Sequence, residues 1–138
     1  MNVKRTTQTQ MLPLRSPLEG TTVDAADASA TPSITIFTLP KPFDDPHIAC
    51  IQRNAIASWQ ALGESVEVIL IGDEAGIAET ADELGTIHVG HVQRNEHGTP
   101  LVSDAFNIAL ASSQAEVLVF CNADVILLHD FKLSLIHI

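Results

Sequence analysis

The stretch that most constrains the fold is 116–128, an apolar run interrupted by a short polar turn. Residues 117–121 are rich in β-forming side chains and end at Asn122-Ala123-Asp124, after which apolar residues resume. A short apolar run bounded by polar residues is typical of a strand buried on both faces of a sheet. A carboxylate that follows such a strand lies at the carboxyl edge, where open α/β sheets bind ligands. We therefore expect Asp124 to be the centre of a site.

The chain from Ser33 onward alternates between strand-like and helix-like segments. The first are β-branched or aliphatic, and the second have apolar residues at three- and four-residue spacing. We expect strands at 33–38, 66–71, 86–89 and 117–121, with helices between them, the third beginning at Thr99-Pro100. The alternation predicts an α/β fold, with a Rossmann-like, parallel-dominated sheet and helices on both faces. Trp59 and Phe120 are expected to be substantially buried.

Composition limits the partners of the chain. Its 138 residues have a formal net charge of -10, and the seven Lys and Arg are scattered. Nucleic-acid binding is not expected, because it requires a basic stripe. An acidic protein can still bind a phosphorylated ligand if a divalent metal bridges the charges. No apolar run reaches the ~20 residues of a membrane span. We interpret Cys50 and Cys121 as reduced core thiols of a cytoplasmic protein.

The N-terminal segment 1–32 is rich in Thr, Ser, Ala and Pro and has no sustained periodicity. We interpret it as a disordered or loosely attached arm. A transit peptide is the alternative, and acidic residues at Glu19, Asp24 and Asp27 argue against it.

The segment from Asn107 to Asp124 is a helix with small residues that leads into an apolar strand ending at Asn-Ala-Asp. It resembles the helix-strand-DxD segment of family-2-type glycosyltransferases with the GT-A fold. The resemblance extends more weakly over 33–131. It implies a nucleotide-sugar-binding domain, incomplete in this chain, whose partner is a nucleotide-diphosphate sugar. It also implies that Asp73, after the second strand, contacts the nucleotide base.

The resemblance further implies a divalent metal, Mn²⁺ or Mg²⁺, at Asp124. Such a cation stabilises a diphosphate leaving group and prefers oxygen ligands such as carboxylate. The family most often has aspartate where this chain has Asn122, which we expect to bind the ribose or a metal-bound water instead. Lys41, after the first strand, is expected near the nucleotide. Phe106 stands where the family often has an arginine beside Asn107.

Simpler interpretations remain open for several of these residues. Asp124 and Asp73 are also suited to capping turns. Asp104 fits the first turn of a helix, where the macrodipole favours an acid. Asn107 is interpreted as an ordinary helix residue, and Arg94 as a solvated loop residue. Three histidines lack the spacing of a zinc site and are expected at the surface or at a strand edge: His88, His91 and His97.

The segment 132–138 does not fit the family or a capping helix. Residues 133–138 match the translation of CTG-TCT-CTT-ATA-CAC-ATC, a transposon end used as a sequencing adapter. We therefore expect a reading frame truncated there, with the acceptor half missing and the catalytic residues unknown.

Two other classes of function stay open beside the enzyme fragment. One is a non-catalytic Rossmann-like module that binds a ligand or a partner. The other is a nucleotidyltransferase, for which Lys41 is the available cation after the first strand. The site hypothesis itself predicts that Asp73 and Asp124 lie at the same carboxyl edge and face one cleft.

Overall fold

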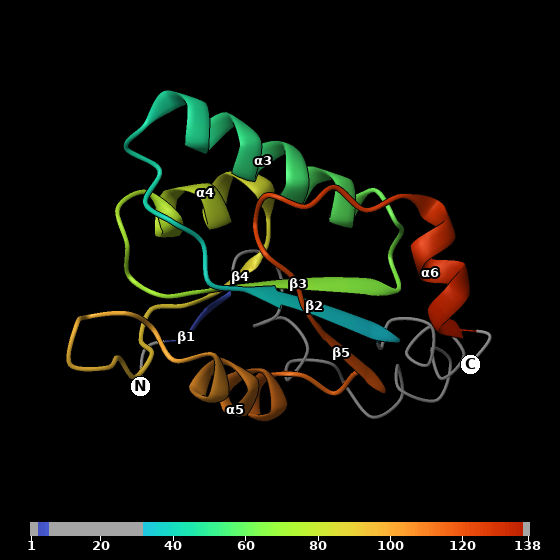
Figure 1. Ribbon diagram of the computed structural model, residues 1–138. Helices are drawn as coiled ribbons and strands as arrows, with labels where there is room; N and C mark the ends of the chain where they lie inside the picture. Colours follow the sequence, from blue (N-terminus) through green and yellow to red (C-terminus); the bar gives the residue numbers. More distant parts are fainter. Residues whose placement is uncertain (1–2, 6–31, 137–138) are drawn as a thin grey trace, which may run out of the picture.

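The computed structural model of the protein describes residues 3–5 and 32–136, and its elements form a layered α/β fold (Figure 1). In chain order they are β1 (Val3–Arg5), β2 (Ile34–Thr38), α3 (Pro46–Gln60), β3 (Val66–Ile71), α4 (Ile77–Leu84), β4 (Ile87–Val89), α5 (Val102–Ser112), β5 (Val117–Phe120) and α6 (His129–Ile136). The described strands form one sheet in the order β1-β4-β3-β2-β5. β2, β3, β4 and β5 are parallel, and β1 is antiparallel to β4. The predicted parallel-dominated α/β fold is confirmed.

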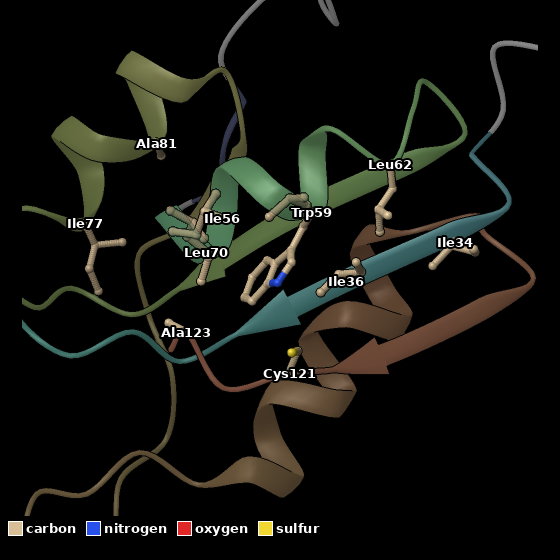
Figure 2. Close-up of a cluster of buried hydrophobic side chains, with 12 residues drawn as sticks. Ile34, Ile36, Ile56, Trp59, Leu62, Leu70, Ile77, Ala81, Cys121 and Ala123 are labelled. Atoms are coloured by element: carbon tan, nitrogen blue, oxygen red, sulfur yellow. The ribbon is translucent and has the colours of Figure 1, made fainter. Parts of the chain in front are cut away.

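Helices cover both faces of the sheet, as predicted. Figure 1 shows α3, α4 and α6 on one side and α5 on the other. Because side chains alternate along a strand, each strand contributes to two separate cores. The α3 side contains Ile36, Leu70 and Ala123, and Trp59 points from α3 into this layer (Figure 2). Trp59 is fully buried, as predicted.

Local sequence explains the start of α3 and the end of α4. The carboxylate of Asp45 accepts hydrogen bonds from the N–H groups of His47 and Ile48, and Pro46 occupies the first turn of α3. α4 ends at Gly85, whose φ of 74° lies in the left-handed region. The predicted start of the third helix at Thr99-Pro100 is wrong. α5 begins at Val102, because Pro100 forms an isolated β-bridge with Arg94.

The strand from which the sequence argument began lies at the edge of the sheet. Val117–Phe120 pairs with β2 on one side only, and all four residues are partly exposed. Both faces of the strand do pack on a core, Val117 and Val119 on the α3 side and Leu118 and Phe120 on the α5 side. The expected full burial is wrong, because no described strand covers the outer edge. Phe120 is accordingly half-buried rather than substantially buried.

The two ends of the chain differ from the sequence expectation. Most of the predicted arm 1–32 lies outside the described residues, but Val3–Arg5 forms strand β1, which the sequence argument did not foresee. At the other end α6 runs across residue 132, and Leu135 packs on the α3-side core. The expectation that the tail forms no capping helix is wrong there. Within 3–5 and 32–136, no helix has the length and apolar character needed to cross a membrane.

Candidate functional site

A pocket of about 340 Å³ opens at the carboxyl edge of the sheet. It lies between the segment after β2, the first turns of α3 and the segment after β5. Its lining residues are Leu39, Lys41, Ile48, Ile51, Gln52, Asn122, Ala123 and Asp124. Three of the predicted site residues, Lys41, Asn122 and Asp124, are therefore brought together by loops that are about 80 residues apart in the chain. Parallel strands produce this result, because their carboxyl ends meet at one edge.

The backbone of Lys41 is fixed by the side chain of Gln52. The Gln52 Oε1 atom accepts a hydrogen bond from Lys41 N–H at 2.7 Å, and Gln52 Nε2 donates to the Lys41 carbonyl at 3.0 Å. Gln52 is only 3% exposed. A buried amide needs partners for both of its polar atoms, and here one residue supplies them. α3 thus holds the Lys41 segment at the pocket while the lysine side chain stays exposed.

The segment after β5 is held from the same helix. The indole Nε1 of Trp59 donates to the carbonyl of Val125 at 2.8 Å, and Leu127 N–H donates to Ser58 Oγ at 3.1 Å. Ala123 is buried in the core between these anchors and β5. Asn122 closes a turn by accepting a hydrogen bond from Val125 N–H on its carbonyl. Asp124 sits in this braced loop with an exposed side chain that lines the pocket.

Asp73 lies outside this pocket. Because β3 and β5 both run parallel to β2, Asp73 and Asp124 do follow the same carboxyl edge. However, the Asp73 carboxylate is engaged by Arg94 Nη2 at 2.8 Å, and the same nitrogen bonds Glu74 at 2.6 Å. These hydrogen bonds, with Glu74 first, raise the pKa of the Arg94 guanidinium. The prediction of one cleft shared by Asp73 and Asp124 is therefore not what the pocket shows.

Arg94 is more than a solvated loop residue. Besides Asp73 and Glu74, it donates from Nη1 to the carbonyl of Gly98, and so ties the loop after β4 to the loop after β3. Asp104 tethers the same region, since its Oδ2 accepts from Gln93 N–H at 2.8 Å. Asp104 also stands in the first turn of α5, as expected for an acid near a helix N-terminus.

The polar side chains that line the pocket are one lysine, one carboxylate and two amides, of which the Gln52 amide is already bonded to the Lys41 backbone. Within residues 3–5 and 32–136, no three or more His, Cys, Asp and Glu residues group so that they could hold a metal ion. A protein cage for a cation is therefore not formed by these residues. Mg²⁺, however, commonly binds through one or two carboxylates together with substrate phosphates and water. The oxygens of Asp124 and Asn122 fit that mode, in which the ligand completes the coordination.

The equivalents of the Arg-Asn pair lie away from the pocket. Phe106 packs edge-on against Phe37, with ring centroids 4.8 Å apart, and its centroid lies 6.2 Å from that of Phe120. Asn107 is exposed on α5 and does not line the pocket, which agrees with its interpretation as an ordinary helix residue. At the position where the family often has an arginine, this chain therefore has an aromatic side chain that packs on the α5 side of the sheet.

Two predictions about histidine and cysteine are corrected. His88 is 6% exposed and its Nε2 lies 2.8 Å from the carbonyl of Gly72, so it is a buried residue linking β4 to the end of β3. Cys121 is buried, and burial, with a contribution from the charge of Asp124, raises the pKa of its thiol. Cys50 is exposed on α3 and is not a core thiol. Both cysteines are free.

Sequence reasoning missed the α3 contribution to the pocket. A usable signal existed in Gln52, an amide that lies one turn from both Ile48 and Ile56 on a helix whose face is otherwise apolar. A polar residue in an apolar stripe indicates a buried partner. Nothing in the local pattern distinguishes Ile48 and Ile51, which line the pocket, from ordinary core residues.

The fold and the site together define an α/β protein with an open pocket at the carboxyl edge of a parallel sheet. No family model, no curated protein and no solved structure matches the chain.

Proposed function

We propose that the pocket binds a nucleotide-diphosphate sugar together with a divalent cation, Mn²⁺ or Mg²⁺. The observation that supports this most is the convergence of Lys41, Asn122 and Asp124 on one pocket. A lysine and a carboxylate-bound cation both neutralise a diphosphate, which an acidic chain would otherwise repel. Asp124 is the metal ligand in this proposal, and Asn122 binds a ribose hydroxyl or a metal-bound water.

The pocket has an apolar side and a charged side, which suggest where the parts of the ligand bind. Leu39, Ile48 and Ile51 form an apolar side, whereas Lys41 and Asp124 form a charged side. Ligand sites typically combine an apolar wall with a small number of placed polar groups. The charged side suits the diphosphate. The assignment of Asp73 to the base rests on the resemblance alone, because Asp73 lies outside this pocket and its Oδ1 atom binds Arg94.

The reaction class proposed is glycosyl transfer, by resemblance of the 107–124 segment to GT-A enzymes. When bound, the cation would stabilise the diphosphate as a leaving group. The chain's own contribution is to orient the diphosphate between Lys41 and Asp124. Two free cysteines fit action in a reducing compartment such as the cytoplasm. The second candidate, a non-catalytic ligand-binding module, is favoured by the presence of a single carboxylate in the pocket.

A thermal-shift titration tests the proposal. Uridine and guanosine diphosphates are added to the full chain with MnCl₂ or with a chelator. Ligand at ~100 times its dissociation constant stabilises the folded state by about 2.7 kcal/mol. We expect a clear shift with metal and a much smaller one with chelator, because the acidic chain repels an uncompensated diphosphate.

Two variants assign the effect to the pocket. Asp124→Asn is expected to remove the metal-dependent part of the shift. Glu64→Gln makes the same charge change in the turn before β3, at the opposite edge of the sheet, and should leave the shift intact. A ligand-induced rise in Tm that is the same with metal and with chelator, and the same in Asp124→Asn, would reject the metal role of Asp124. The absence of any shift with either nucleotide would reject the proposed function.

A further inference from the structure

The outer side of β5 is an open sheet edge. Val117 N–H donates to the carbonyl of Ser33 and Cys121 N–H donates to that of Phe37, both at 3.1 Å. Because backbone groups alternate along a strand, the N–H and C=O groups of Leu118 and Phe120 point away from β2. Within the described residues no strand pairs with this side. The opposite edge of the parallel strands is different, because β1 pairs there with β4.

Nothing in the strand itself blocks further pairing. Natural edge strands are usually protected by charged side chains, proline or a bulge. Residues 117–120 read Val-Leu-Val-Phe, without charge or proline. They are also partly exposed at all four positions. The edge is therefore competent to accept another strand.

Large apolar side chains are exposed on α5 and in the segment that follows β5, the two segments next to this edge. On α5, residues 102, 106 and 110 recur every fourth position. The Phe106 ring lies 4.8 Å from that of Phe37 in β2 and 6.2 Å from that of Phe120 in β5, so the stripe lies over the β2–β5 end of the sheet. On the other face the chain turns back after β5 and passes alongside α3 (Figure 1). The flanking residues are Val102, Phe106, Leu110, Val125, Ile126 and Leu128, with exposures of 45%, 40%, 64%, 41%, 59% and 71%.

We infer that β5 pairs antiparallel with β5 of a second copy of this chain, which continues the sheet across a twofold axis. This inference is independent of the proposed function. The chain has a net charge of -10, so two copies repel unless they meet at an uncharged surface. Residues 117–120 and the six flanking side chains carry no charge, and the nearest carboxylates, Glu116 and Asp124, lie beyond the two ends of the strand. A second copy therefore approaches here more readily than over the acidic remainder.

Charge also selects the register. Placing Val119 opposite Val119 of the partner subunit sets Leu118 against the partner's Phe120, and both residues have outward backbone groups that exchange hydrogen bonds. Leu118 and Phe120 belong to the α5-side core, so each extends the aromatic group of the other copy. In this register Glu116 faces the partner's Asn122. Centring the pair on Phe120 instead would set Glu116 against the partner's Asp124, and like charges directly opposite are destabilising.

The interface is of moderate size. A whole aliphatic side chain covers ~100 Å² and an aromatic one ~200 Å². The six flanking residues then supply on the order of 800 Å² from two copies, before the strand itself is counted. This lies at the lower limit of specific interfaces, and we expect a dimer that dissociates on dilution. Since both copies are acidic, added salt should strengthen it.

The test is sedimentation equilibrium of the full chain between roughly 5 and 500 µM, at low and at high NaCl. We expect a monomer–dimer equilibrium whose dissociation constant falls as salt rises. Leu110→Glu places a charge in the flank of the edge and should raise the dissociation constant about tenfold or more. Ala57→Glu adds the same charge to an exposed position of α3, on the far side of that helix layer, and should leave it nearly unchanged.

Amide hydrogen exchange locates the contact. The N–H groups of Leu118 and Phe120 should be protected at high chain concentration and should exchange rapidly on dilution. A chain that stays monomeric over the whole range would overturn the inference. So would a dimer in which those two amides exchange freely, a dimer insensitive to Leu110→Glu, or open-ended aggregates in place of a dimer.

Discussion

The hydrogen bonds between Gln52 and Lys41 allow a quantitative prediction. Gln52→Ala removes both the acceptor and the donor that hold the Lys41 backbone. Each such bond is worth about 0.5–1.5 kcal/mol net, and the side chain is only 3% exposed, so little water compensates in the folded state. We expect the variant to lose about 2 kcal/mol of unfolding free energy. For ~100 ordered residues this lowers Tm by roughly 8 °C.

The assay is urea unfolding followed by tryptophan emission. Trp59 is the single tryptophan of the chain and is fully buried, so its emission reports the α3-side core. Asn54→Ala is the matched control, because it removes an amide from the exposed face of the same helix, where Asn54 donates to a weak sulfur acceptor on Cys50. If Gln52→Ala and Asn54→Ala agree within ~0.5 kcal/mol, the pair does not stabilise the fold as argued.

Three further perturbations have defined outcomes. Gly76→Ala should destabilise by about 2–4 kcal/mol in urea unfolding, because φ is +84° and an added Cβ would lie 2.6 Å from a neighbouring side chain. Gly98 also has a positive φ but has open space around its Cα, so Gly98→Ala should lose only ~1 kcal/mol. Equal losses in the two variants would refute the steric argument. Arg94→Met should speed amide exchange at Gly98, whose carbonyl it binds, and unchanged exchange there would show that the ion pairs do not order the loop. Burial raises the pKa of Cys121 in the folded state, so the contribution of the neutral thiol to the free energy of unfolding is complete below the unfolded pKa of about 8.5 and is lost as pH rises above it. Cys121→Ala should therefore make the free energy of unfolding fall less steeply with pH in this range. Iodoacetamide should modify the exposed Cys50 before Cys121, and prior reaction at Cys121 in the folded chain would contradict the burial argument.

Periodicity predicted the architecture well, whereas the cap signal at Thr99-Pro100 did not mark the start of α5. The alternation of strand-like and helix-like segments predicts the order of strands and helices along the chain. Because helices connect successive strands, a parallel sheet follows. The N-cap at Asp45 and the stop at Gly85 are local events, which local sequence records. β1 was not predictable in this way, because Val3–Arg5 is a strand only by virtue of its partner β4, far along the chain.

Burial of β5 was misjudged for a physical reason. An apolar run reports that a strand can be buried, and it does not report whether a neighbour exists on each side. The same limit applies to the site. Lys41, Asn122 and Asp124 could be predicted as site residues because each follows a strand. The ion pair of Asp73 with Arg94 and the hydrogen bond of Gln52 with Lys41 depend on tertiary proximity, which the local sequence does not record.

The pairing of β1 with β4 determines an order of events during synthesis. Val3 pairs with Val89, so the first strand to be made joins the sheet only after the chain has grown by 89 - 3 = 86 positions. At about 5–20 residues per second, a ribosome takes roughly 4–17 s to cover that distance. During this interval β1 lacks β4, its partner in the described sheet, while β2 and β3 are already available to each other. Residues 3–5 therefore join the sheet late, and the outer edge of β4 stays unpaired until they do.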